Sequence, residues 1–140
     1  MKVGIICAGD EELAPFLPFI SEYNIIEKAM LKFYAGQIDG LEVVALFSGV
    51  CKVNAAIASQ LLIDVFGVNI IINSGTAGAM ETASIAHVCY VNRIPFISIR
   101  CITDTPRQSG IDNFHDNCAK ASAIAKDITA ALLAEINEFW

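Results

Sequence analysis

Acidic side chains follow the first apolar segment of the chain. Asp10, Glu11 and Glu12 come directly after the run 3–8. Mutual repulsion makes one of several crowded carboxylates easier to protonate, so that it can serve as a general acid or base. Acidic residues are also common in the first turn of a helix, where they face the positive end of its dipole. Either an acid–base site or a helix start is therefore expected here.

Small and polar residues gather near the middle of the chain. The stretch SGTAG, residues 74–78, would let backbone N–H groups and the Thr76 hydroxyl approach a ligand's oxygens, or could simply form a tight turn. It lacks the GxGxxG pattern and the Walker lysine. Met80 and Glu81 follow, and Glu81 could accept two hydrogen bonds from a sugar diol while Met80 offers an apolar face. Glu81 could equally pair with a helix dipole.

A further carboxylate, Asp104, ends the apolar segment 94–104. A single carboxyl group after a buried run is a candidate proton donor, although it could instead cap a turn. His87 and His115 have no partners at metal-ligand spacing. We therefore expect no metal site.

Strands and helices must position these residues. The apolar runs 3–8, 68–73 and 94–104 are typical of strands buried on both faces of a parallel sheet. The segment 31–50 predicts two strands joined at Asp39-Gly40, a dipeptide that favours a tight hairpin turn. Ligands of such sheets bind beyond the carboxyl ends of the strands, where the candidate residues would stand.

Helical patterns alternate with these strands. A short helix is expected from Glu11 and should end or kink by Pro18. Longer helices are predicted over 52–66, 81–93 and 113–139. Gly67 would end the first of these. The apolar face of the last helix is expected to contain Ile124, Ile128, Leu132 and Ile136. The alternation predicts an α/β fold: one three-layer α/β/α domain over residues 1–140 with a mostly parallel mixed sheet.

The composition excludes several classes of protein. A net charge of −6 disfavours general binding to nucleic acid or anionic membranes. No apolar run approaches the roughly 20 residues that span a bilayer. The five cysteines are odd in number and show no CxxC spacing, so we expect reduced, mostly buried thiols. A small neutral or cationic ligand and a cytoplasmic location fit this composition.

Four stretches, taken in order, closely resemble the 5′-methylthioadenosine/S-adenosylhomocysteine nucleosidases of the purine nucleoside phosphorylase superfamily. They are MKVGIICAGDEE, YAGQIDGLEVVALFSGVCKVNAA, INSGTAG and METASIAHVCYVNRIPFISIRCITD. The resemblance implies a nucleoside phosphorylase-like fold. It also implies hydrolysis, without a cofactor, of the N-glycosidic bond between adenine and a 5′-thio-substituted ribose, usually by a cytoplasmic homodimer. The implied partner is thus a small purine nucleoside.

The resemblance also implies a role for each motif residue. Glu12 would deprotonate the attacking water, and Asp104 would protonate the leaving adenine at N7. The implied substrate-binding residues are Val50, Thr76, Met80, Glu81, Thr103 and Phe114. Glu81 would hold the ribose hydroxyls with Met80 against the sugar, and Thr103 would lie beside the base. Val50 and Phe114 would line the pocket for the 5′-alkylthio group.

The chain departs from the family pattern at two places. In the family a long middle section separates GTAG from MET, whereas here the two motifs join at Ala79-Met80, so we infer an internal deletion. That section carries the adenine-stacking segment and residues that reach into the neighbouring subunit's pocket. Cys51 stands where the family usually has glycine.

Three interpretations of the function follow. The chain could be a shortened nucleosidase that completes its pocket through a partner subunit. It could instead be a non-catalytic remnant that retains weak purine-nucleoside binding or an oligomer interface. The third interpretation is a phosphate-binding flavodoxin-like module, and only the glycine-rich stretch 74–78 supports it.

Overall fold

The strands form one mixed sheet. A computed structural model describes residues 1–76, 79–103 and 111–139, with the backbone alone for residues 79 and 111–116. The strands in these ranges are β1 (Lys2–Cys7), β2 (Ser21–Lys28), β3 (Leu31–Ile38), β4 (Leu41–Phe47), β5 (Ile70–Thr76) and β6 (Phe96–Cys101). They lie in the order β2-β3-β4-β1-β5-β6. β1 pairs in parallel with β4 and β5, and β5 with β6, while β2-β3 and β3-β4 are antiparallel.

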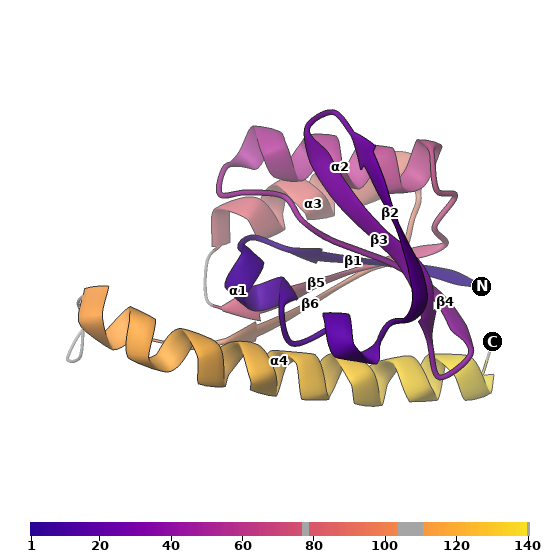
Figure 1. The fold of residues 1–140 in the computed structure, drawn as a ribbon. Coiled ribbons are helices and arrows are strands. Elements are labelled where there is room, and N and C mark those ends of the chain that lie inside the picture. The colour runs from indigo at the N-terminus through magenta and orange to yellow at the C-terminus, as the bar shows by residue number, and fades with distance from the viewer. Residues whose placement is uncertain (77–78, 104–110, 140) are drawn as a thin grey trace.

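Helices cover both faces of this sheet. They are α1 (Asp10–Leu13), the 3-10 turn η1 (Leu17–Phe19), α2 (Lys52–Asp64), α3 (Ala79–Asn92) and α4 (Ile111–Phe139). α2 and α3 lie on one face, and α4 runs along the other beneath α1 and η1 (Figure 1). The predicted three-layer α/β/α arrangement is therefore confirmed.

Each face of the sheet has its own apolar core. Ile5 of β1 and Leu133 of α4 belong to one buried cluster, and Leu46 of β4, Leu62 of α2 and Ile85 of α3 belong to the other. Burial of such side chains is the main favourable term in folding, at about 25 cal/mol per Å² of apolar surface. The two clusters fix the central strands between the helical layers.

The hairpin turn predicted at Asp39-Gly40 is confirmed. Asp39 and Gly40 have φ values of 49° and 82°, the left-handed conformations that a tight hairpin turn requires. Gly67, with φ 65°, follows α2 in the same conformation, as a glycine that ends a helix does.

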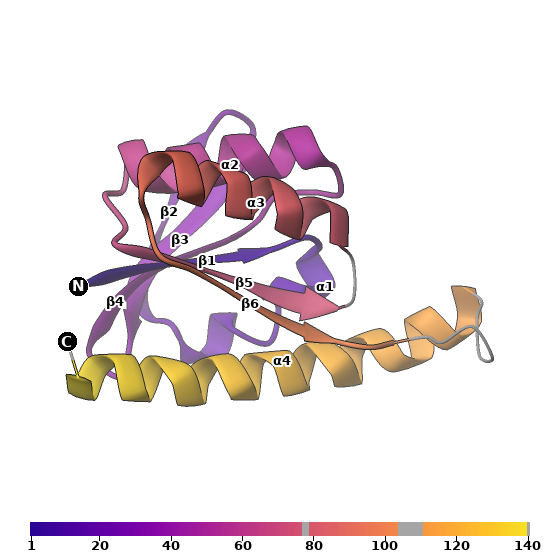
Figure 2. The ribbon, with the colours of Figure 1, turned by 180° about the vertical axis from the view of Figure 1, so that it is seen from behind.

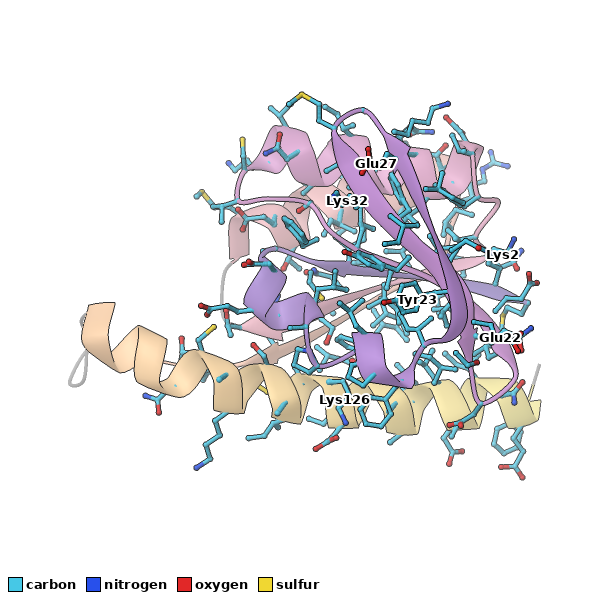
Figure 3. All side chains as sticks on the ribbon, in the orientation of Figure 1. Lys2, Glu22, Tyr23, Glu27, Lys32 and Lys126 are labelled. Atoms are coloured by element: carbon cyan, nitrogen blue, oxygen red, sulfur yellow. The ribbon has the colours of Figure 1, made fainter. Side chains whose placement is uncertain are left out.

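A second hairpin, formed by β2 and β3, was not among the predicted elements. All eight residues of β2 are exposed, and the strand pairs with β3 alone. Because an edge strand of this kind buries little, its sequence carries no clear alternation of apolar and polar residues. Glu27 and Lys32 lie across this hairpin, with a carboxylate-to-ammonium distance of 3.7 Å (Figure 3).

Two details of the predicted elements are wrong. Residues 74–76 were expected in a loop, but they belong to β5, which extends to Thr76 and pairs with β6 up to Cys101. The expected apolar face of α4 is confirmed at Leu132 and Ile136, which belong to or pack against the core, but not at Ile124 and Ile128. Ile124 and Ile128 are 44% and 49% exposed, because small and polar side chains occupy the buried face at these turns. Those buried residues are Cys118, Ala121, Ser122, Ala125 and Thr129.

Candidate active site

Glu12 lies at the carboxyl end of β1, where α1 begins. Its side chain is buried and accepts four hydrogen bonds. The backbone N–H groups of Ala8 and Gly9 donate to Oε2 at 2.7 and 3.2 Å. The backbone N–H and the hydroxyl of Thr76 donate to Oε1 at 2.7 and 2.6 Å. The carboxylate is thus held between the ends of two neighbouring parallel strands, as expected of a ligand site in an open α/β sheet.

Gly75 allows this close approach of β5 to Glu12. A Cβ atom at position 75 would lie 2.5 Å from Cδ of Glu12 and 2.6 Å from each carboxylate oxygen. No side chain fits at such distances, so a glycine is required beside the carboxylate. The glycine-rich stretch therefore makes room for a protein side chain at this point.

Arg100 of β6 brings a positive charge to the same site. Its Nη1 donates to the Thr76 carbonyl at 2.7 Å, and its Nη2 donates to Asn73 Oδ1 at 2.6 Å. Nε and Nη2 also donate to the Thr82 hydroxyl, at 3.1 and 2.7 Å. Burial lowers the pKa of Arg100, and the nearby carboxylates Glu12 and Glu81 oppose this shift. The guanidinium is therefore fixed within electrostatic reach of both candidate carboxylates.

Sequence reasoning did not identify Arg100 and Asn73 as site residues. Asn73 is fully buried in β5, donates to the Ile6 carbonyl at 2.9 Å and accepts from the Thr82 hydroxyl at 2.8 Å. Asn73 directly follows an unbroken apolar run in β5, and Arg100 is the one charged residue of β6. A buried polar group must find partners, so this pattern was the available signal for both.

Glu81 contributes a second buried carboxylate from the first turn of α3. Its side chain is 6% exposed, and among the described residues its Oε1 has no hydrogen-bond partner. An unsatisfied buried carboxylate oxygen is costly and calls for a bound donor. The structure thus brings Glu12, Thr76 and Glu81 together around Arg100.

The remaining predicted residues differ in their placement. Thr103 is buried, and its carbonyl accepts a hydrogen bond from the Asn117 side chain at 3.1 Å. Val50 and Met80 are 76% and 59% exposed, so neither packs into a closed pocket in this chain. Asp104 lies outside the described residues, and so does the Phe114 side chain.

Metal-ligating side chains do not cluster in the described part of the chain. Over residues 1–76, 79–103 and 117–139, no group of three or more His, Cys, Asp or Glu side chains is placed to hold a metal ion. Cys7, next to the site, is fully buried, and burial together with the Glu12 charge raises its pKa well above the usual value. A neutral thiol of this kind is a poor metal ligand and a poor nucleophile. In the same ranges no helix is both long and apolar enough to cross a membrane.

Comparison with known families matches almost the whole chain. The sequence model of the family described as Phosphorylase superfamily matches residues 2–80 and again residues 79–134. A relative from Staphylococcus carnosus, named 5′-methylthioadenosine/S-adenosylhomocysteine nucleosidase, is 46% identical to this chain over 79 residues. These residues make up 56% of this chain and 35% of the relative. The same enzyme of Listeria welshimeri is 44% identical over 100 residues, 69% of this chain and 42% of the relative.

Coverage of these relatives is partial. The chain spans 35–42% of the length of the curated relatives it matches. The activity of the complete relatives therefore does not transfer directly to this chain.

Solved structures share the fold. A 5′-methylthioadenosine/S-adenosylhomocysteine nucleosidase of S. pneumoniae, determined with a transition-state inhibitor, superposes with a TM-score of 0.89 at 19% identity. The alignment spans 95% of this chain and 98% of that one. A futalosine hydrolase of Helicobacter pylori superposes with a TM-score of 0.88 at 15% identity, with spans of 96% and 98%. At these identities the similarity establishes the fold alone.

Proposed function

Because the chain belongs to the phosphorylase superfamily, we propose that its carboxylate site hydrolyses the N-glycosidic bond of 5′-methylthioadenosine or S-adenosylhomocysteine and releases adenine. Curated relatives with that activity in their names are 40–46% identical to it over the matched residues. The observation that carries the proposal is the buried pair Glu12 and Glu81, with Glu12 fully held and one Glu81 oxygen unpartnered.

In the proposed mechanism Glu12 activates the attacking water. As adenine leaves, positive charge develops on the ribose, and nearby carboxylates stabilise it. Of the four donors to Glu12, the Thr76 hydroxyl is the one side-chain group, and it can rotate away. A water in that position would lie within hydrogen-bond reach of Oε1 and could transfer its proton there.

Glu81 is proposed to bind the sugar. Its unpartnered Oε1 is an acceptor in a buried setting, and the two ribose hydroxyls are donors that would satisfy it. A substrate with these hydroxyls would pair an oxygen that otherwise carries a desolvation cost. Sugar recognition thus follows from the chemistry of the site.

Arg100 favours water over phosphate as the nucleophile. A phosphorylase needs guanidinium donors that are free to bind the anion. Here Nε, Nη1 and Nη2 all donate to protein acceptors, namely Thr82, Thr76 and Asn73. The proposal is therefore hydrolysis.

The remaining roles in the proposal rest on the family resemblance. Asp104 would protonate adenine at N7, Thr103 would lie beside the base, Met80 against the sugar, and Val50 and Phe114 at the 5′-alkylthio group. A cytoplasmic homodimer with a role in methionine salvage, and with no affinity for nucleic acid, completes the proposal. Free cysteines throughout the described residues support a reducing compartment.

The proposal includes an internal shortening of the family chain at about residues 79–80. Two observations support it. The family model matches in two pieces that meet at residues 79–80, and the curated relatives are more than twice as long as the part they share with this chain.

Substitutions at the two carboxylates test the proposed roles. Glu12→Gln should lower kcat for methylthioadenosine about 100-fold or more, because the base is lost. Glu81→Gln should mainly raise KM, because the sugar contact is weakened. Glu11→Gln, at the exposed neighbouring position, is the matched control and should retain full activity. Unchanged kcat in folded Glu12→Gln would refute the assignment.

A further inference from the structure

A groove lies at the end of the sheet away from the carboxylate site. Its volume of about 320 Å³ is within the size range of small-molecule sites. Lys2, the first residue of β1, lines the groove, whereas Glu12 follows the other end of that strand. Figure 2 shows the N-terminus of the chain on the side opposite to α1, and Figure 3 shows Lys2 and Glu22 on that side. The groove is therefore separate from the site proposed for hydrolysis.

The floor of the groove consists of two rows of side chains on neighbouring strands. In the outer row, Glu42 of β4 pairs with Lys2 of β1 on one side and with Gln37 of β3 on the other. In the inner row, Val44 of β4 pairs with Ala35 of β3. Side chains of paired residues lie on the same face of a sheet, and this face is the one that α2 covers. The floor thus has a polar outer row and an apolar inner row.

A β-bulge in β2 supplies a polar wall. The register of β2 against β3 shifts between Ser21 and Asn24, where two residues of β2 lie opposite the single residue Gly36. Ser21 and Asn24 would face opposite sides of a regular strand, but the extra residue lets both line the groove together with Glu22. A Cβ at position 36 would lie 2.6 Å from the Ser21 carbonyl oxygen, so a side chain there would collide with the bulge. Glu22 itself has φ 50°, a left-handed conformation that is uncommon for a residue other than glycine.

The polar groups of the groove are only partly paired within the protein. The Lys2 ammonium lies 3.6 Å from Oε1 of Glu42, so these two charges offset each other. Among the residues that the structure describes, the side chains of Glu22, Asn24 and Gln37 have no hydrogen-bond or ion-pair partner. The groove therefore has one uncompensated negative charge, on Glu22, and two amide oxygens that can accept hydrogen bonds.

Apolar side chains complete the groove. Phe66, which follows α2, and Ile26 of β2 both line it. The Phe66 ring is held against Phe33, with the two ring centroids 4.6 Å apart. Ile26 is 40% exposed. A ligand that covered these side chains would remove apolar surface from water, which favours binding.

We propose that this groove binds a small organic monocation, an ammonium group attached to an aromatic or alkyl body. The ammonium would lie at Glu22 and donate to the amide oxygens of Asn24 and Gln37, while the apolar body would lie against Phe66. An anion is disfavoured, because Lys2 is already paired and the whole chain carries a net charge of −6. Binding here does not depend on the proposed nucleosidase activity, because neither Glu12 nor Glu81 lines the groove.

A charge series of one ligand tests the proposed class. In NMR titrations with 2-phenylethylammonium, the amide signals of Ala35, Gln37 and Val44 should shift to saturation with a Kd of about 1 mM or below. The Thr76 amide, at the carboxylate site, should not shift. The uncharged 2-phenylethanol should bind about fivefold more weakly, because it lacks the charge that pairs with Glu22, and the anion 3-phenylpropionate should not bind. Shifts confined to the carboxylate site, or an alcohol or anion that binds as tightly as the cation, would overturn the assignment.

Two substitutions test the position of the ligand. Glu22→Gln removes the charge at nearly constant size and should raise the Kd of 2-phenylethylammonium about fivefold. Glu27→Gln removes the same charge from β2 outside the groove, so this matched control should leave the Kd unchanged. Ala35→Leu would fill the inner row and should abolish saturable binding while circular dichroism stays native. If that variant does not fold, the comparison of the two glutamine variants decides. Equal Kd values for those two, or unchanged binding by folded Ala35→Leu, would contradict this location.

Discussion

The Glu12 carboxylate depends for its position on backbone groups at the ends of two strands. Ala8 and Gly9 follow β1, and Thr76 ends β5. Any change in the spacing of these strands therefore changes the position of the Glu12 carboxylate and the lengths of its hydrogen bonds. Gly75 is the residue that permits this spacing. The first prediction concerns this contact.

Gly75→Ala should displace Glu12. The added Cβ would lie 2.5 Å from Cδ, so either β5 or the carboxylate must move. Overpacking of this kind costs about 1–3 kcal/mol, which urea denaturation can measure. Gly9→Ala is the matched control, because its Cβ would meet nothing within 4 Å. Equal stability of the two variants would show that β5 does not approach Glu12 this closely.

Cys51→Gly should stabilise the protein. Cys51 has φ 150° and ψ 142°, a conformation that is unfavourable for any residue with a Cβ. Relief of about 1–3 kcal/mol of strain should exceed the entropic cost of a glycine, about 0.5–1 kcal/mol. The melting temperature should rise by a few degrees, whereas Cys51→Ser should leave it unchanged. A lower melting temperature for the glycine variant would contradict the strained geometry.

The thiols should differ strongly in reactivity at pH 8. Cys51 is exposed, whereas Cys7 and Cys89 are buried, and burial raises the pKa of Cys89 to about 11. Thiolates are the reactive form, so Cys89 should react with Ellman's reagent at least 100-fold more slowly than Cys51. Mass spectrometry of the partially labelled protein identifies the sites. Labelling of Cys89 and Cys51 at similar rates would disagree with a buried position for Cys89.

At this scale the sequence permitted only part of the site to be predicted. Glu12, Thr76 and Glu81 follow apolar segments, and their chemistry suggested a site before any geometry was known. Arg100 and Asn73 lie inside strands, where a polar residue indicates that it needs a buried partner but does not identify that partner. Their pairing depends on the register of β5 and β6, which a linear sequence does not specify.

Among the elements, α4 is joined to β5 by a buried polar contact. The hydroxyls of Thr129 and Ser74 lie 2.9 Å apart, and both residues are fully buried. Thr129→Val should cost about 1–3 kcal/mol, because the Ser74 hydroxyl then loses this partner. The double variant with Ser74→Ala should cost less than the sum of the two single changes. Urea unfolding of the four proteins gives the coupling energy. Strict additivity would show that the two hydroxyls do not interact.

The elements with strong local signals could be predicted, and those defined by their surroundings could not. β1 and β5 begin with continuous apolar runs, and the Asp39-Gly40 turn consists of residues that tolerate positive φ. The residues of these elements themselves determine the local structure, so the elements could be predicted. β2 forms only because β3 is beside it. The apolar periodicity of α4 placed Ile124 and Ile128 inward, yet the helix approaches β5 through small residues instead. Close packing against the sheet thus outweighed hydrophobic periodicity.

At the scale of the whole molecule, the chain retains the superfamily's α/β/α arrangement while spanning 35–42% of its curated relatives. The fold class followed from the alternation of strands and helices, and the observed order of strands agrees with a mostly parallel mixed sheet. The proposed loss of the middle section would remove the segment that, by the family resemblance, stacks on adenine. Positioning can account for roughly 7–11 kcal/mol of a reaction barrier, so a missing adenine platform would reduce the rate severely.

The central claim is that this shortened chain still assembles a nucleosidase site. The most direct measurement is adenine release from methylthioadenosine by the purified 140-residue chain, followed by ultraviolet absorbance, with Asp104→Asn alongside. We predict release by the native chain and its loss in the variant, with circular dichroism unchanged, because the leaving adenine would lack its proton donor. No release from the folded native chain, or equal release by both proteins, would contradict the account.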